Sequence, residues 1–156
     1  MMTIVETDLA LYQRYGDDLI RYATALVGPA DAADVVQDAV IAAFGAPGWA
    51  AIGNRRAYLY RAVFNRSVSL RRSTSRRDHR ERKVAQRDLL DDRSPSVDAR
   101  AALGTLSAQQ RAVVYLTYWE DLTPAQIADM LDVGEGTVRK QLARAREALR
   151  RILDEH

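Results

Sequence analysis

The sequence contains no cysteine, and this absence excludes several kinds of chemistry. Disulfide bonds, thiolate metal sites and a cysteine nucleophile all require a thiol group. Histidine is scarce as well, because the only two copies, His79 and His156, lie in a charged stretch and at the chain end. No cluster of metal ligands or catalytic side chains is visible, so we expect neither a metal ion nor a cofactor.

Long apolar runs are also missing. No stretch approaches the ~20 apolar residues that are needed to cross a membrane. The chain starts Met-Met-Thr-Ile-Val-Glu-Thr-Asp, which lacks the basic segment and apolar core of a signal peptide. We therefore expect no membrane insertion and a cytoplasmic location.

Aromatic residues are few, at 7% of the chain, whereas Ala, Leu and Arg are abundant. These three residues have high helix propensity, and the alternating pattern typical of strands is absent. A composition of 47% hydrophobic and 28% charged residues is typical of a globular protein that buries a core. We predict an all-α protein made of two small helical domains joined by a charged flexible linker.

Charge is distributed unevenly along the chain. Residues 1–49 contain two arginines against seven acidic residues, whereas residues 50–90 contain twelve basic residues against three acidic ones. An acidic beginning followed by a strongly basic segment indicates two different partner surfaces, one of which suits a polyanion.

The N-terminal domain, residues 1–73, is predicted to contain three helices. The first carries an apolar stripe at spacings of three and four and stops at Gly28-Pro29. The second is capped by Asp31 and ends before the segment 45–48, which contains two glycines and a proline. The third is capped by Asn54 and runs to about Arg72. Matching apolar faces allow these helices to form a small bundle.

A linker is predicted over residues 74–97. Its first half is mostly charged and lacks apolar periodicity, so it cannot bury a core. The later Asp-Asp-Arg-Ser-Pro-Ser sequence is also typical of a linker.

The C-terminal domain, residues 98–156, has clear helix signals. Ser107 and Thr123 are each followed three residues later by Gln, which is the pattern of a capping box. Helices are therefore expected from Ala108 to Trp119 and from Pro124 to Leu131. Residues 132–134 then form a turn, and a last helix begins near Glu135.

The last two helices predict a helix-turn-helix that binds duplex DNA. An apolar face repeats along the final helix, and basic side chains occupy the rest. Residues near its start, Thr137, Arg139, Lys140 and Gln141, are expected to face base edges and phosphates in the major groove, and Arg144 and Arg146 to contact phosphates. The alternative interpretation is a solvated basic face on a structural helix.

A second nucleic-acid signal lies in the middle of the chain, where aromatic and basic residues interleave. The residues are Trp49, Tyr58, Tyr60 and Phe64 among Arg55, Arg56, Arg61, Arg66, Arg71 and Arg72. Bases can stack on such rings while the cations follow the backbone of a single strand. The alternative is that the rings form the core of the bundle, which must hold for some of them.

In this order and spacing, the segments resemble the extracytoplasmic-function (ECF) sigma factors, the two-domain sigma subunits of bacterial RNA polymerase. Residues 33–38, Ala-Asp-Val-Val-Gln-Asp, resemble the family's polymerase-binding helix. Residues 57–61, with Asn65 and the pair Arg71-Arg72, resemble the helix that melts and reads the −10 promoter element. Residues 106–111, 127–128, 136–138 and 144–146, together with Leu149, resemble the domain that binds the −35 element.

The resemblance implies a set of contact residues for each partner. Polymerase would contact Asp34, Val35, Gln37 and Asp38. The −10 element would contact Trp49, Asn54, Arg55, Arg56, Tyr58, Arg61, Asn65, Arg71 and Arg72. The −35 element would contact Arg111 together with Thr137, Arg139, Lys140, Gln141, Arg144 and Arg146.

The same resemblance implies the partners. These are core RNA polymerase, through its largest and second-largest subunits, promoter DNA, and an anti-sigma factor that masks both surfaces. The chain would then be no enzyme, because catalysis belongs to the polymerase. One departure concerns Lys140-Gln141, which stand where the family commonly has Ser-Arg. This exchange predicts an unusual −35 preference.

Two other functions are compatible with parts of the sequence. A free-standing helix-turn-helix regulator would bind duplex DNA without polymerase, but it would need neither the acidic helix nor the aromatic and basic segment. A nuclease would need a convergent set of carboxylates, whereas the acidic residues of 1–49 are expected at helix caps and on solvated faces.

Overall fold

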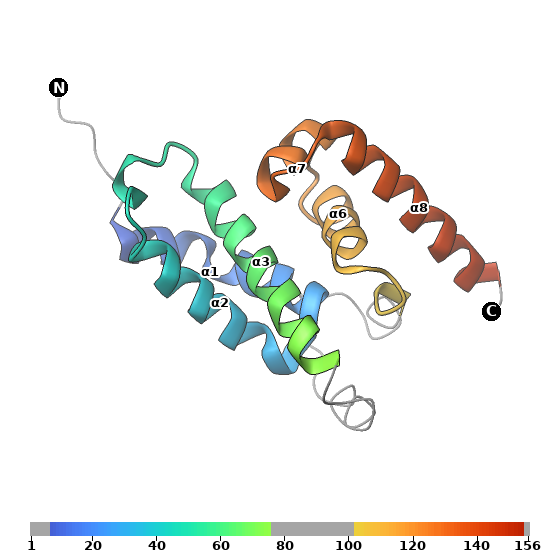
Figure 1. Cartoon of the computed structure of the whole chain (residues 1–156), viewed down its shortest axis with the longest axis horizontal. Helices are drawn as coiled ribbons and strands as arrows, with labels where there is room; N and C mark the ends of the chain where they lie inside the picture. The colour runs from blue at the N-terminus through green and yellow to red at the C-terminus, as the bar shows by residue number, and fades with distance from the viewer. Residues whose placement is uncertain (1–6, 76–101, 155–156) are drawn as a thin grey trace.

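A computed structural model describes residues 7–75 and 102–154, and all regular structure in these two ranges is helical (Figure 1). The predicted all-α fold class is therefore confirmed. The linker predicted over residues 74–97 lies outside the described residues, apart from its first two positions, which belong to a helix. Neither His79 nor His156 is among the described residues.

The N-terminal half consists of the helices α1, Asp8–Val27, α2, Pro29–Phe44, and α3, Arg55–Ser75, with a short 3-10 turn, η1, Trp49–Ala51, before α3. All three long helices pack against one another. The C-terminal half consists of α6, Ala108–Tyr118, α7, Pro124–Leu131, and α8, Glu135–Asp154. Here α8 packs across both α6 and α7.

Most predicted helix ends are confirmed, and one cap is wrong. The side chain of Asn54 accepts a hydrogen bond from the amide of Ala57 at 3.0 Å and so caps α3. Asp31, in contrast, lies in the first turn of α2 rather than at its cap. The helix begins two residues earlier because Pro29 occupies a first-turn position, where its missing amide hydrogen is not needed. Gly28 precedes it with a positive φ of 90°, which a glycine adopts without strain.

Both capping boxes of the C-terminal half are present. The Thr123 hydroxyl accepts a hydrogen bond from the amide of Gln126 at 3.2 Å, and the Gln126 side chain accepts one from the amide of Thr123 at 2.9 Å. The turn after α7 is where it was predicted. Its left-handed residue is Asp132, with φ of 56°, while Gly134 has no positive φ.

We expect Thr123→Ala to lower the free energy of unfolding by about 1 kcal/mol, because it removes the side-chain acceptor at the start of the short helix α7. Denaturant unfolding followed by circular dichroism measures this difference. Thr123→Ser is the matched control, since it keeps the hydroxyl. If both variants lost the same stability, the cap would not be the cause.

The two halves are packed together in the structure. Contacts join α1 to α6 and α3 to α7, so α6 and α7 lie between the N-terminal helices and α8 (Figure 1). Buried residues of both halves form one continuous hydrophobic cluster. No helix within the described ranges is long and apolar enough to cross a membrane.

Candidate nucleic-acid interface

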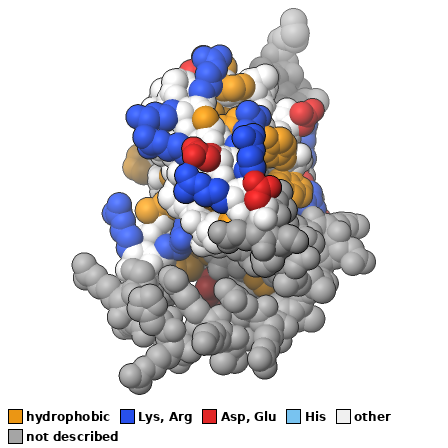
Figure 2. Space-filling view, turned by 90° about the vertical axis from the view of Figure 1, so that its right-hand side faces the viewer, with side chains coloured by type: hydrophobic (Ala, Val, Ile, Leu, Met, Phe, Trp, Pro, Cys, Tyr) orange, Lys and Arg blue, Asp and Glu red, His pale blue; other side chains and the backbone are white. Residues whose placement is uncertain are grey.

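Helix α8 has one buried face and one open basic face. Val138 and Ala145 are completely buried and Leu142 is nearly so, which anchors the helix on α6 and α7. The remaining positions carry the basic residues, which are exposed. Figure 2, which looks at the side of the molecule that carries α8, shows Lys and Arg side chains gathered on this face with isolated acidic side chains between them.

The predicted −35 residues of α8 differ in how firmly they are held. Lys140 and Arg144 are exposed and form no ion pair or hydrogen bond with another described residue. Arg139 donates to Glu135 at 2.6 Å, and Thr137 is exposed. The amide oxygen of Gln141 accepts a hydrogen bond from Gln110 of α6 at 3.2 Å, which holds this side chain toward the body of the domain.

Arg146 is oriented by a contact that was not expected from the sequence. Its Nε donates to the hydroxyl of Tyr118 at 2.7 Å, and its guanidinium carbon lies 5.7 Å from the centre of the same ring. Tyr118 is itself exposed at the end of α6. The contact leaves the outer nitrogen atoms of Arg146 available for another partner.

Arg111 is the one predicted −35 residue that lies away from the α8 face. Its guanidinium donates to the carbonyl of Leu26 at 2.8 Å, which is at the end of α1 in the other half. Two further hydrogen bonds go to the carbonyls of Gly104 and Leu106, at 3.0 and 3.3 Å. Arg111 therefore joins the two halves in this structure.

The predicted −10 residues extend from η1 along most of α3, and one of them is buried. Trp49 is a core residue, because its ring packs on Phe44 and Tyr58 at centroid distances of 5.2 and 5.7 Å and its indole nitrogen donates to Asp8 at 2.9 Å. For this ring the core interpretation is the correct one. Arg55 lies over its face at 5.2 Å, so Trp49 supports the surface without belonging to it.

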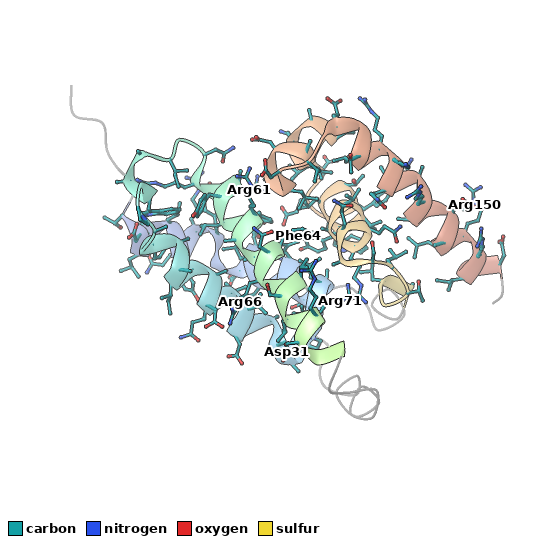
Figure 3. All side chains as sticks on the ribbon, viewed as in Figure 1. Asp31, Arg61, Phe64, Arg66, Arg71 and Arg150 are labelled. Atoms are coloured by element: carbon teal, nitrogen blue, oxygen red, sulfur yellow. The ribbon has the colours of Figure 1, made fainter. Side chains whose placement is uncertain are left out.

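The remaining −10 residues of α3 point in different directions. Figure 3 shows Arg61 and Arg66 leaving opposite sides of the helix, toward α7 and α2 respectively. Arg61 donates to the carbonyl of Asp129 in α7 at 2.5 Å. Arg56 forms an ion pair with Glu120 at 3.2 Å. Asn65 is exposed on the side of α3 that faces α2. Arg71 and Arg72 lie near the end of α3. The structure therefore does not bring the whole set to one surface.

The predicted polymerase-binding helix presents a mixed polar and apolar face. Asp34, Gln37 and Asp38 are exposed on α2, whereas Val35 is 3% exposed and packs in the core. Val35 is therefore corrected from a surface contact to a residue that holds the helix in place. Ile41, at 63% exposed, was missed by the sequence reasoning.

Ile41 belongs to an open hollow of about 500 Å³ between α2 and α3. Asp38, Asn65 and Arg66 also line it, and Asp38 pairs with Arg66 at 3.0 Å across it. A signal for Ile41 was present in the sequence. It follows Asp34 by seven residues and Asp38 by three, and so shares their side of the helix.

A third group of residues lies between the halves, and no sequence signal indicated that its members would meet. Tyr22, Tyr60 and Tyr115 come from α1, α3 and α6, and each is at most 2% exposed. Burial raises the pKa of each hydroxyl well above its ordinary value of about 10, so all three stay protonated even at an alkaline pH that ionises an exposed tyrosine. Glu120, next to Tyr60, raises the pKa of that group further.

Comparison with known proteins identifies both halves. Residues 11–77 match the family described as Sigma-70 region 2, and residues 96–149 match Sigma-70, region 4. The chain is similar to the ECF RNA polymerase sigma factor SigL of Mycobacterium tuberculosis, at 34% identity over 158 residues, covering 94% of this chain and 88% of that protein. The RNA polymerase sigma-E factor of Streptomyces coelicolor is 31% identical over 147 residues, covering 88% and 80%.

Solved structures of similar fold include that of a sigma factor. The sigma factor RpoE from Bartonella quintana, solved in complex with the anti-sigma factor NepR, superimposes with a TM-score of 0.72 at 21% identity and covers 96% of this chain and 98% of that one. CnrH, solved in complex with the cytosolic domain of CnrY, has a TM-score of 0.65 at 24% identity, with coverage of 95% and 88%. These two likenesses establish the fold.

The match to region 2 covers the half that a free-standing helix-turn-helix regulator would not require. It therefore decides between the two DNA-binding functions considered from the sequence. With relatives that span nearly the whole chain at more than 30% identity, the chain belongs to the family of extracytoplasmic-function RNA polymerase sigma factors.

Proposed function

We propose that this sigma factor uses separate helices for its separate partners, with α2 docking on core RNA polymerase and α8 reading the −35 element. The observation that carries the proposal is that both faces are open in the same structure and lie on opposite halves of the molecule. The α2 face is acidic with one exposed isoleucine, and the α8 face is basic.

The α8 surface suits the major groove of duplex DNA. It offers two cations, Lys140 and Arg144, that have no ion-pair partner within residues 7–75 and 102–154 and lie within about one turn of each other; Arg146 is held by Tyr118 with its outer nitrogens available. Cations of this kind contact phosphates and fix the register, whereas Thr137 and Arg139 lie nearer the start of the helix, where base edges are read. Gln141 carries a neutral amide at the position where the family commonly has a positively charged arginine.

The −10 residues that remain accessible begin at the start of α3 and continue along that helix. Arg55, Tyr58 and Asn65 remain partly or fully exposed on the N-terminal half, and Arg72 is exposed near the end of α3. Trp49 stays beneath them as support. We assign these residues to the unpaired non-template strand, whose bases stack and whose phosphates attract cations.

The α2 face suits a protein partner of mixed chemistry. Three exposed polar side chains, Asp34, Gln37 and Asp38, surround the exposed Ile41 beside the hollow between α2 and α3. An apolar centre with a polar rim is typical of protein interfaces. In this assignment the polymerase clamp covers Ile41, and Val35 contributes only by packing α2 onto the core.

Control by an anti-sigma factor is part of the proposal. It is supported by the two solved structures of the same fold, one bound to the anti-sigma factor NepR and the other to the cytosolic domain of CnrY. In the proposed role the chain carries out no catalysis itself and acts in the cytoplasm, where the polymerase is found. Binding free energy is used to hold unpaired bases outside the stack.

Reconstitution with core polymerase tests this function. We expect the purified chain and core enzyme together to start transcription at a small set of genomic promoters, which sequencing of the transcripts identifies. The core enzyme alone is the control. If the mixture started no transcripts while the chain alone shifted duplex DNA tightly, the protein would be a regulator that works without polymerase.

A further inference from the structure

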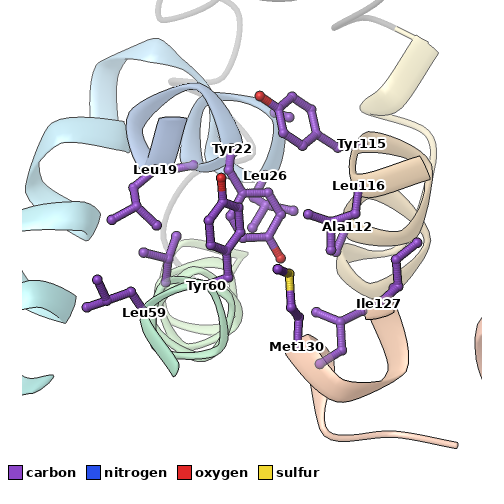
Figure 4. Packing of buried hydrophobic residues seen from close by; sticks show 14 of the residues in the cluster. Leu19, Tyr22, Leu26, Leu59, Tyr60, Ala112, Tyr115, Leu116, Ile127 and Met130 are labelled. Atoms are coloured by element: carbon purple, nitrogen blue, oxygen red, sulfur yellow. The ribbon is translucent and has the colours of Figure 1, made fainter. Parts of the chain in front are cut away.

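The end of α6 carries two aromatic side chains that are exposed, Tyr118 and Trp119. The Trp119 ring stacks on Tyr115, with ring centres 5.7 Å apart and the two planes inclined by 4°. Tyr115 is 2% exposed and belongs to the buried cluster between the halves, where Figure 4 shows it with Leu116 of the same helix. A hydrogen bond of 2.9 Å from the amide of Trp119 to the carbonyl of Tyr115 closes the last turn. Tyr118 therefore projects from a helix end that is firmly anchored.

Tyr118 holds the side chain of Arg146, which lies 28 positions later on α8. The phenol oxygen accepts the 2.7 Å hydrogen bond from Nε, and the guanidinium carbon lies 5.7 Å from the ring centre. The hydrogen bond and the cation–π contact together limit the rotation of the guanidinium. The two terminal nitrogen atoms form no hydrogen bond or ion pair within residues 7–75 and 102–154. Arg146 is therefore oriented, but its terminal N–H groups are not used.

The partner of Arg146 is neutral, which distinguishes this side chain from other arginines on α8. Arg139 and Arg151 are held by carboxylates, those of Glu135 and Glu147, at 2.6 and 2.9 Å. A carboxylate orients an arginine, but its charge also opposes the attraction between the arginine and a phosphate. A phenol oxygen supplies an acceptor without that negative charge. Arg146 thus keeps its full positive charge for an anionic partner.

A fixed direction has a specific benefit for DNA binding. An arginine side chain has large rotamer freedom, and ordering it when a complex forms costs free energy. Where the free protein already holds the side chain, that cost does not reduce the affinity. The terminal nitrogens of a guanidinium form a planar fork that can donate to two phosphate oxygens at once. The contact with Tyr118 occupies Nε and leaves this fork open.

We propose that Tyr118 is a positioning residue for −35 binding: its hydroxyl holds Arg146 with the terminal nitrogens turned toward a phosphate. The sequence reasoning assigned no role to Tyr118, because the contact joins the end of α6 to the middle of α8. The inference rests on the proposed function, since it concerns how one of the assigned −35 residues is presented. Tyr118 acts through Arg146 and does not itself need to touch DNA.

The first test detects the contact in solution in the full chain. Proton–nitrogen correlation spectra of the isotope-labelled protein resolve the Nε–H groups of arginines, and the signal lost in Arg146→Lys identifies that of Arg146. We expect Tyr118→Phe to speed the exchange of this proton with water by at least about threefold, because the hydrogen bond that shields it is lost. Tyr12→Phe is the matched control, since it removes the hydroxyl of another exposed tyrosine, on α1. In that variant the exchange rate of the Arg146 proton should equal that of the parent chain.

The second test is a double-mutant cycle on the affinity of the holoenzyme for a duplex that carries an upstream element identified by transcript sequencing. We expect Tyr118→Phe to lower this affinity about threefold to tenfold, because Arg146 must then be ordered as it binds. In a chain that already carries Arg146→Ala, the same change should cost less than about twofold. Tyr12→Phe should again match the parent chain. Arg146→Ala alone should reduce the slope of log K against log salt by about one, whereas Tyr118→Phe keeps the cation and the slope.

Three results would overturn the inference. The first is an unchanged exchange rate of the Arg146 Nε–H group in Tyr118→Phe. The second is an equal loss of DNA affinity from Tyr118→Phe with and without Arg146→Ala, which would indicate a general effect on the domain. The third is no loss of affinity from Tyr118→Phe or from Arg146→Ala in an otherwise unchanged chain. Each leaves the proposed function standing if the parent holoenzyme still starts transcripts, whereas a holoenzyme that starts none contradicts the proposed function itself.

Discussion

A chain that carries both Lys140→Glu and Arg144→Glu will bind the −35 element at least about a hundredfold more weakly than the parent chain. Both side chains are exposed on α8 and form no pair within the described residues, so their charges are available to phosphates. Loss of each charge-assisted hydrogen bond costs about 1.5–3 kcal/mol, and reversal adds repulsion. The measurement is the affinity of the holoenzyme for a duplex that carries an upstream element found by transcript sequencing.

Charge, and not helix structure, should account for this loss. The variant with Lys140→Arg and Arg144→Lys keeps both charges. Its affinity for the −35 element should be close to that of the parent chain. Dependence on salt gives a second measure, because removal of two phosphate contacts should reduce the slope of log K against log salt by about two. If the holoenzyme bound the element equally well with the charge-reversing pair and with the charge-preserving pair of substitutions, the −35 contacts would lie elsewhere on the chain.

Asp34→Arg will raise the dissociation constant for core RNA polymerase by about a hundredfold or more. Asp34 is exposed on the α2 face that we assign to the polymerase, and a reversed charge in a protein interface costs several kcal/mol. The side chain is on the surface, so the fold should be preserved. Fluorescence anisotropy of the labelled chain titrated with core enzyme measures this change.

The matched control for this prediction is Asp17→Arg in α1, which makes the same charge change at an exposed position outside α2. We expect its affinity for core enzyme to be close to that of the parent chain. DNA binding by the isolated Asp34→Arg chain should fall no further than that of the control. If both variants lost polymerase affinity equally, overall charge rather than the α2 face would govern docking.

Local signals predicted the C-terminal half well. The capping boxes at Ser107 and Thr123 placed the starts of α6 and α7, because the bonds that satisfy a helix start come from residues three positions apart. The two faces of α8 followed from helical periodicity alone. The error at Asp31 arose where two local signals competed, and proline at the first turn prevailed over an acidic cap.

Burial of individual aromatic residues could not be predicted in the same way. A ring interleaved with arginines has the same sequence pattern whether it stacks on a base or packs in a bundle. Trp49 and Tyr60 are buried because residues from other helices surround them, Phe44 for the first and Tyr22 for the second. Tyr58 remains half-buried at the surface.

The sequence by itself determined that the chain has no thiol group, that its two halves are helical, and that they carry surfaces of opposite charge. These properties depend on composition and on spacings of three or four residues. The tertiary structure alone decided that Arg56, Arg61 and Arg111 form hydrogen bonds with groups of the other half of the chain. The reason is sequence separation: Arg56 meets Glu120 across 64 positions, and Arg111 meets Leu26 across 85. Only the packing of α1 and α3 on α6 and α7 brings those groups within hydrogen-bonding distance.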